Sequence, residues 1–473
     1  MDKRYKKLAK NSAIFAIANF GSKILKFLMV PFYTYCLTTS EYGTVDTLIT
    51  TINLLLPVII LAVHEAALRY ALKQDEDNKV VLTNCFLIII ASAVVLLFSY
   101  FVFCKIKLFI GLWHLFYLVI VSNSAYYVIQ NFTRGIGRSF VFALGGIINT
   151  MVLLSSNILL LAVFKLGVKG YLVSIFLSYI VASIYMGFTI KLHRLISFSA
   201  VDFNALKRML KYSIPLIPTA MMWWVMNASD RYVINFFIGV SATGIYAVAH
   251  KIPTVITMFY QIFQQAWQIS AVEEKNGADN EQIEHFYENV YLVFIKVLFL
   301  GTSVCILIVK PLIEAIISID YATAWVYVPM LLIGTIFSSL AGFLGINYAV
   351  SEKTIGAFIT SAISAVINFV LNIILTPCFG MQGTAIATFI GFYSLWLVRT
   401  RHSRIFIAMH QFYGLIHCFL SLMLIQSVLA LNPNMFTILA QLAIIIIIIC
   451  LSRKELKIMM RMTGKVFAKL WHR

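Results

Sequence analysis

The chain has 473 residues, of which 61% are hydrophobic and only 12% are charged, and its formal net charge is +18. Soluble globular proteins carry about twice this share of charged residues, so the composition excludes a soluble globular enzyme. A helix of about 20 apolar residues crosses the hydrocarbon layer of a bilayer, and the chain holds about fourteen stretches of that kind. The sequence therefore predicts an all-α polytopic membrane protein.

Charged residues, Gly or Pro bound each long apolar window. The expected membrane-spanning segments are 11–37, 44–70, 80–104, 108–132, 140–164, 170–192, 212–238, 245–271, 287–310, 322–350, 354–376, 383–407, 412–431 and 435–451. The basic start MDKRYKK runs into the first window without a small-residue cleavage site, so we expect a retained first span. The Cys residues lie in or beside apolar runs without metal-binding spacing, and no metal site is expected.

Lys and Arg concentrate in the segments that are cytoplasmic if both termini are cytoplasmic. The predicted outer loops, in contrast, hold Lys105, Lys107, Lys165, Lys169 and Lys310. The positive-inside rule therefore places both termini in the cytoplasm. This asymmetry explains the basic charge without a nucleic-acid partner and makes anionic membrane lipids the expected partners. Two basic amphipathic segments, 203–211 and the tail 452–473, are predicted to lie on the inner leaflet.

The chain also repeats itself. A step of 201 residues takes Lys10, Ser12 and Gly43 onto Lys211, Ser213 and Gly244. The expected domains are an N-lobe of six helices (1–195), a C-lobe of six helices (196–408), two extra helices (409–451) and the cytoplasmic tail (452–473). Because six is an even number, both lobes share one orientation. They would then be related by a pseudo-twofold axis along the membrane normal, with a substrate cavity between them.

Several short motifs, in this order, resemble the oligosaccharide flippases of the polysaccharide transporter branch of the multidrug, oligosaccharidyl-lipid and polysaccharide exporter superfamily. They are Asn11-Ser12, Pro31-Phe32-Tyr33, Leu37, Glu41-Tyr42-Gly43, Tyr212-Ser213-Ile214-Pro215-Leu216-Ile217-Pro218, Asp230-Arg231-Tyr232 and Gly244-Ile245-Tyr246. The resemblance covers essentially the whole chain and includes the O-antigen flippases.

The resemblance implies a secondary transporter and no enzymatic activity. Its members move undecaprenyl-diphosphate-linked oligosaccharides from the inner to the outer leaflet of the bacterial cytoplasmic membrane, for lipopolysaccharide and other surface polysaccharides. The implied partners are the lipid-linked oligosaccharide and the polysaccharide polymerase with its chain-length machinery. No cofactor is expected, and a proton or sodium gradient is the expected energy source.

Polar residues form one stripe along the first predicted span. Ser12, Asn19, Lys23 and Lys26 follow helical spacing, and Lys26 lies about 22 Å of helix beyond Asn11, near mid-membrane. A cation at that depth would offset the desolvation of a diphosphate. We therefore predict that Lys26, Lys23 and Asn19 bind substrate, the alternative for Lys26 being a lysine neutralised within a helix interface.

The second half contains charges at similar depth. Asp230 and Arg231 are adjacent, so we expect their side chains to point in different directions, with Arg231 and Lys251 lining the cavity wall of the C-lobe. The alternative is a structural salt bridge between helices, or a side chain that reaches the membrane surface.

The second predicted span carries His64 and Glu65, which are candidates for ion coupling together with Asp230. The alternative is that Glu65 pairs with Arg69 one helical turn later and is neutralised by it.

Other polar and aromatic groups have two readings each. Trp223 and Trp224 either stack on a sugar or pack between helices, and the amides of the 261–268 segment either bind sugar hydroxyls or form an interfacial belt. Small polar residues at helical spacing favour helix packing over sugar contact; they are Ser361, Ser364, Asn368 and Asn372. Alternative functions are a lipid II (peptidoglycan precursor) flippase, a membrane polysaccharide polymerase or ligase, and a drug exporter.

Overall fold

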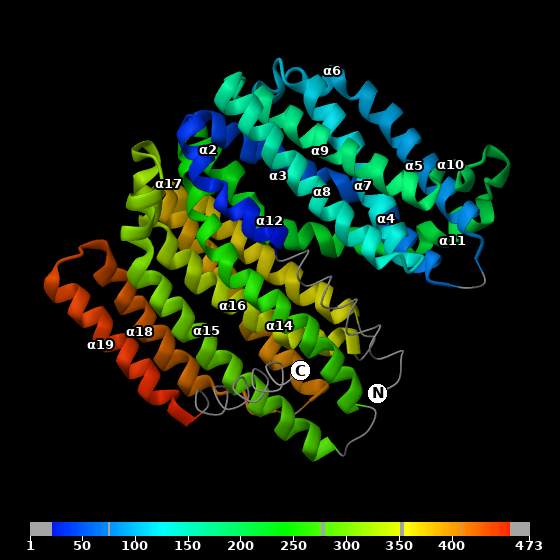
Figure 1. The fold of residues 1–473 in the computed structure, drawn as a ribbon. Helices are drawn as coiled ribbons and strands as arrows, with labels where there is room; N and C mark the ends of the chain where they lie inside the picture. Colours follow the sequence, from blue (N-terminus) through cyan, green and yellow to red (C-terminus); the bar gives the residue numbers. More distant parts are fainter. Residues whose placement is uncertain (1–20, 74–75, 276–279, 351–353, 408, 455–473) are drawn as a thin grey trace, which may run out of the picture. The chain divides into compact units, whose positions relative to one another are not determined.

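The computed structural model describes residues 21–73, 76–275, 280–350, 354–407 and 409–454, and these residues form helices and no strand (Figure 1). The all-α fold is therefore confirmed. In the described part, eight helices are long and apolar enough to cross a membrane. The α-helices are α2 (Val30–Cys36), α3 (Thr39–Ile59), α4 (Val63–Ala71), α5 (Asn78–Phe98), α6 (Tyr100–Phe103), α7 (Trp113–Gly135), α8 (Ser139–Asn157), α9 (Gly167–Ile190), α10 (Leu192–Leu195), α11 (Phe203–Ser213), α12 (Ile217–Phe237), α13 (Val240–Ala249), α14 (Lys251–Lys275), α15 (Asn280–Ile316), α16 (Val328–Val350), α17 (Thr354–His402), α18 (Tyr413–Leu431) and α19 (Met435–Leu451).

Shorter helical pieces join several of these helices. They are the 3₁₀ segments η1 (Lys107–Phe109), η3 (Phe198–Ala200), η4 (Ile214–Leu216), η5 (Ile319–Val326) and η6 (Ser403–Ile405), and the π-helical segment η2 (Ile158–Val163). Residues 21–28 are also helical and precede α2.

Two predicted spans differ from the helices in an informative way. The predicted span 44–70 is divided, because α3 ends at Ile59 and α4 starts at Val63. Between them, Leu61 and Ala62 have φ of 51°, a left-handed conformation that costs a non-glycine residue about 1–2 kcal/mol. Conversely, α17 joins two predicted spans across Gly380, where φ is 60° and ψ is −146°, a conformation open to glycine alone.

The chain divides into two compact units, Met1–Ala247 and Val248–Arg473. This division comes later in the chain than the predicted lobe boundary after residue 195, which stays a prediction. The first unit extends further because α12 packs against α3.

In the first unit, α7 lies beside α4, α8 and α9. Its buried face includes Phe116, Val128 and Phe132, which are fully buried. Burial of an aromatic side chain contributes roughly 2–3 kcal/mol, so α7 is the central helix of this unit and holds its other residues at fixed positions.

Glycines bring α3 and α13 into close contact within the first unit. A Cβ added to Gly43 would lie 2.1 Å from the carbonyl oxygen of Val240, and one added to Gly244 would lie 1.9 Å from that of Thr39. The two contacts are reciprocal, since Thr39 and Gly43 correspond to Val240 and Gly244 at the repeat offset of 201 residues. A reciprocal contact of this kind is what a twofold axis produces, and it supports the predicted repeat.

In the second unit, α16 packs against α14, α15 and α17, and α18 and α19 pack against α15. The polar stripe on α17 is buried between helices. The side chain of Asn368 donates to the carbonyl of Ala387 at 3.2 Å, and Ser361 accepts a hydrogen bond from Arg399 at 3.1 Å. These contacts agree with the helix-packing interpretation of the stripe.

The first predicted surface segment is indeed a helix, α11, which Asp202 caps by accepting hydrogen bonds from the amides of Asn204 and Ala205. Lys207 and Arg208 are exposed on it. The second predicted surface helix, in the tail, lies almost wholly outside the described residues.

Candidate functional site

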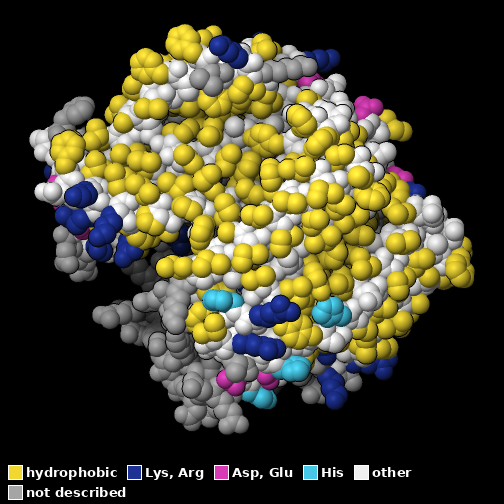
Figure 2. All heavy atoms as spheres, turned by 180° about the vertical axis from the view of Figure 1, so that it is seen from behind, with side chains coloured by type: hydrophobic (Ala, Val, Ile, Leu, Met, Phe, Trp, Pro, Cys, Tyr) yellow, Lys and Arg dark blue, Asp and Glu magenta, His cyan; other side chains and the backbone are white. Residues whose placement is uncertain are grey.

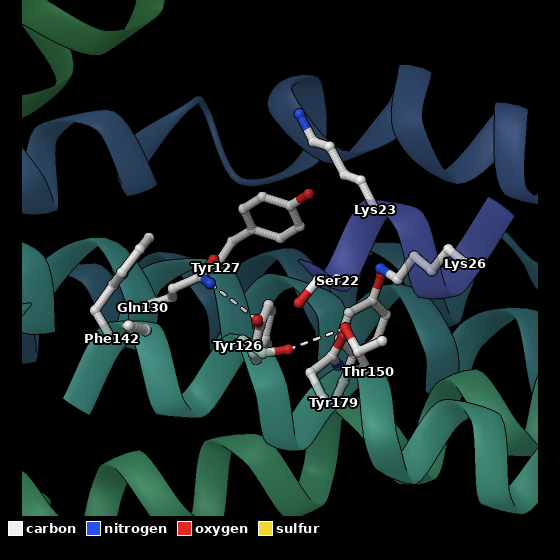
Figure 3. A pocket seen from close by; sticks show the side chains of 12 residues that line it. Ser22, Lys23, Lys26, Tyr126, Tyr127, Gln130, Phe142, Thr150 and Tyr179 are labelled. Carbon is white, nitrogen blue, oxygen red and sulfur yellow. Dashed lines mark hydrogen bonds between the residues drawn. The ribbon is translucent and has the colours of Figure 1, made fainter. Parts of the chain in front are cut away.

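A cavity of about 260 Å³ lies in the first unit, between the segment 21–28 and helices α7, α8 and α9 (Figure 3). We call it the lysine–tyrosine cavity. Its lining residues are Ser22, Lys23, Lys26, Tyr126, Tyr127, Gln130, Phe142, Ala143, Gly146, Asn149, Thr150 and Tyr179.

Two cations enter this cavity from the segment 21–28. Lys23 and Lys26 are both exposed instead of packed into protein. In Figure 3, Lys26 extends toward Thr150 and Tyr179, whereas Lys23 extends away from them. Among the described residues no carboxylate forms an ion pair with Lys26. The neutralised-lysine alternative therefore has no support in the described part of the chain, and the cavity is positively charged.

Neutral polar groups form the opposite wall. Gln130 donates a hydrogen bond to the hydroxyl of Tyr126 at 2.9 Å, and Asn149 donates one to Ser178 at 3.1 Å. Tyr126 also packs against Tyr179, with ring centroids 5.1 Å apart. These contacts hold the rings and amides in place before any ligand arrives.

The two walls suit different parts of one ligand. Ammonium groups stabilise phosphate oxygens, while aromatic faces and amides bind the faces and hydroxyls of a sugar ring. The cavity can therefore accommodate an anionic group joined to a polar, hydroxyl-rich group.

His64 and Glu65 lie beside this cavity. The Nε2 atom of His64 is 3.5 Å from a carboxylate oxygen of Glu65, and its ring lies 6.0 Å from that of Tyr127, which lines the cavity. Arg69, in contrast, stacks on Tyr212 with 4.1 Å between the guanidinium carbon and the ring centroid. The expected pair between Glu65 and Arg69 is not formed, because α4 turns Arg69 toward α11.

Asp230 and Arg231 do pair, contrary to our expectation that adjacent residues point apart. The guanidinium of Arg231 lies 2.6 Å from Asp230 and 3.2 Å from Asp46 on α3, and it also donates to the carbonyl of Asn227 at 2.6 Å. Arg231 is buried and does not line the lysine–tyrosine cavity. This group, which we call the arginine triad (Asp46, Asp230 and Arg231), is the structural salt bridge that the sequence left open as an alternative.

The remaining predicted site residues lie elsewhere. Asn19 is outside the described residues, and Lys251 is half-buried at the start of α14 in the second unit. Trp224 donates from its indole to the carbonyl of Thr50 at 2.9 Å, which supports its packing interpretation. Of the 261–268 segment, Trp267 is buried against Phe343.

With this geometry in place, the chain can be compared with known proteins. Residues 8–268, more than half of the chain, match the family described as polysaccharide biosynthesis protein. The chain belongs to that family. A comparison with curated protein sequences gives no significant match.

Solved structures identify the fold of this polysaccharide biosynthesis family member. The inward-closed conformation of the lipid II flippase MurJ matches with a TM-score of 0.72 and 17% identity over 93% of this chain and 99% of that one. An inward-facing multidrug resistance MATE transporter of the MOP superfamily matches with a TM-score of 0.65 and 12% identity, over 81% and 97%. A MOP superfamily transporter from Pyrococcus furiosus matches with a TM-score of 0.61 and 13% identity, over 84% and 95%. The family and superfamily predicted from sequence are confirmed.

Sequence reasoning missed the neutral wall of this family member's cavity. Tyr126, Tyr127, Gln130 and Tyr179 lie inside predicted spans that carry no charge. The available signal was the spacing of Tyr126 and Gln130, which places a phenol and an amide one helical turn apart.

Proposed function

We propose that this protein is a flippase that carries an undecaprenyl-diphosphate-linked oligosaccharide from the inner to the outer leaflet of the bacterial cytoplasmic membrane by alternating access. The observation that carries the proposal is the lysine–tyrosine cavity, which combines exposed Lys23 and Lys26 with rings and amides on the facing wall. The lysines would stabilise the diphosphate where water is scarce, and the neutral wall would contact the first sugars.

The family match to polysaccharide biosynthesis proteins supports a role in making surface polysaccharide. In this proposal both termini are cytoplasmic, the polyprenyl chain stays in lipid, and the protein works beside a polysaccharide polymerase and its chain-length machinery. The protein itself makes or breaks no covalent bond.

A lipid II flippase is the second candidate, because the MurJ structure covers nearly the whole chain. Both substrates present a diphosphate to Lys26, so this lysine does not discriminate between them. The difference lies in the sugars and in the peptide that lipid II carries.

The test is transport in proteoliposomes. The full-length protein is reconstituted with either a fluorescent undecaprenyl-diphosphate oligosaccharide or fluorescent lipid II, and the fraction that reaches the opposite leaflet is measured with a membrane-impermeant quencher. Transport of the oligosaccharide and not of lipid II supports the proposal, and the reverse result replaces it with the second candidate. Transport of neither would overturn both.

For the energy source we propose proton coupling through Glu65 and His64. The carboxylate and the imidazole touch, and Tyr127 connects them to the cavity. His64 also has a buried Nδ1 atom without a hydrogen-bond partner among the described residues, so its ring has an open position for a proton. A sodium gradient is the alternative.

A further inference from the structure

A groove of about 560 Å³ follows one face of α17 near its end and continues onto η6. We call it the α17 groove. Its lining residues are Ser394, Leu397, Val398, Arg401, His402 and Ile405. They recur at intervals of three or four, so they share one helix face. The groove is apolar along the helix and basic at its end.

The basic end of the groove is accessible. Arg401 and Arg404 are exposed, and Ile405 is 68% exposed beside them. Figure 2 shows one face of the molecule on which Lys or Arg and His side chains gather close to one another, bordered by hydrophobic side chains. One carboxylate contacts the chain just beyond: Glu288 accepts a hydrogen bond from the backbone amide of His410.

Buried polar contacts hold this helix end rigidly. Arg399, two residues before Arg401, donates to the carbonyl of Ala341 at 2.8 Å and to Ser361 at 3.1 Å. His402 shares a hydrogen bond of 3.0 Å with the hydroxyl of Tyr348. Because these contacts fix the backbone, Arg401 and Arg404 are positioned by the fold and need little ordering to bind a ligand.

The geometry points to a binding site for an anionic phospholipid of the inner leaflet, with its phosphate at Arg401 and Arg404 and an acyl chain along Leu397 and Val398. Guanidinium groups bind phosphate oxygens in a fixed geometry. The positive-inside prediction places this end of α17 at the cytoplasmic surface, where anionic headgroups attract basic side chains. Tyr393 and Tyr413, both half-buried, are typical of the depth of the lipid headgroups.

Two other occupants fit the α17 groove less well. A lipid-linked sugar needs rings and amides like those of the lysine–tyrosine cavity, whereas this groove offers the hydroxyl of Ser394 among aliphatic and basic residues. The chain's own tail beyond Glu455 carries no carboxylate side chain and five Lys or Arg residues: Lys457, Arg461, Lys465, Lys469 and Arg473. Like charges would repel it from Arg401 and Arg404.

The site is tested on the full-length protein by native mass spectrometry with added phosphatidylglycerol or phosphatidylcholine. We expect the wild type to retain phosphatidylglycerol preferentially. The double variant Arg401→Gln/Arg404→Gln should bind it about 10- to 30-fold more weakly, since each basic residue near a membrane surface contributes about one kcal/mol. The matched control is Arg138→Gln/Arg194→Gln, which removes two exposed arginines from predicted cytoplasmic positions of the first unit.

Further arms separate the possible sources of the signal. Leu397→Trp keeps both arginines but fills the apolar part of the groove, so it should also weaken phosphatidylglycerol binding. Equal losses in the Arg138/Arg194 control would show general surface electrostatics and overturn the site. Displacement of the lipid by soluble glycerol phosphate would show a free-phosphate site, and displacement by undecaprenyl phosphate instead of phosphatidylglycerol would show a substrate site; either result would overturn the proposal.

Discussion

The segment 21–28 and helix α12 stand at equivalent positions in the two predicted repeats. At the offset that the reciprocal glycine contact supports, Lys23 corresponds to Trp224 and Lys26 to Asn227. The first repeat exposes its two cations to the lysine–tyrosine cavity. The second repeat places its nearby cation, Arg231, in a buried triad against α3.

The difference shows that a repeated backbone does not imply repeated chemistry. A lysine that serves an anionic ligand must keep its charge accessible, whereas a buried guanidinium needs carboxylates to offset its desolvation. The same asymmetry continues further along the chain, where His64 and Glu65 correspond to Gln265 and Ala266. The first repeat therefore holds the candidate binding and coupling charges, and α12 contributes a structural one.

The largest effect is expected from Arg231→Ala. This change leaves Asp46 and Asp230 without their cation, and breaking a buried ion pair by removing one partner costs about 3–5 kcal/mol. Thermal unfolding of the purified protein should show a clear drop in the midpoint. Combining Arg231→Met with Asp46→Asn and Asp230→Asn should recover much of the loss, because no uncompensated charge is left. An unchanged midpoint for Arg231→Ala would mean that the triad is not structural.

Lys26→Ala should reduce transport about 10- to 100-fold while the protein still inserts and stays folded. Losing a charge-assisted hydrogen bond costs about 1.5–3 kcal/mol, and about 1.4 kcal/mol corresponds to a tenfold change. Lys26→Arg should keep partial activity, since the charge remains while its geometry changes. The measurement is the leaflet-transfer assay at matched protein levels.

Moving the cation sharpens the same comparison. In Lys26→Asn/Asn227→Lys the charge is transferred to the equivalent position of the second repeat, away from the wall that carries Tyr179 and Thr150. We expect no recovery of transport over Lys26→Asn alone. Full recovery would show that the two positions are interchangeable and that the neutral wall does not define the site.

The helices and the first-repeat charges can be predicted from sequence because hydrophobic length and rare intramembrane charges are strong signals. Lys26 was found in this way. The break at Leu61 and Ala62 was not, since neither residue type signals a left-handed conformation. That break decides which way His64 and Arg69 point, and so the expected partner of Glu65 was wrong.

The arginine triad shows a second limit. Asp46 lies far from Arg231 in the sequence and near the start of a different helix, so spacing along one helix cannot reveal their contact. The same holds for Tyr126 and Tyr179, which meet only because α7 and α9 pack together. Tertiary packing, not local pattern, brings these groups into contact.

A smaller effect is expected from Gly43→Ala. The new methyl group would lie 2.1 Å from the carbonyl oxygen of Val240, so α3 and α13 must move apart, and overpacking of this kind typically costs about 1–3 kcal/mol. We expect a lower unfolding midpoint and slower transport. Gly301→Ala is the matched control, because its added Cβ meets nothing within 4 Å and alanine favours a helix. Equal midpoints for the two variants would contradict a close contact between the repeats.

The smallest effect on folding is expected from Glu65→Gln, which nevertheless tests whether coupling also belongs to the first repeat. The Glu65 side chain is 45% exposed, and its replacement at such a position usually changes the free energy of unfolding by less than about 0.5 kcal/mol. If Glu65 and His64 carry protons, the variant should lose the dependence of transport on an imposed pH gradient and still bind substrate. His64→Gln should behave alike, because the two groups touch, while Arg69→Gln, which removes the stack on Tyr212, should keep the dependence. Retained pH-gradient dependence in Glu65→Gln would remove this pair from the mechanism, and a dependence on a sodium gradient in the wild type would direct the search to another set of residues.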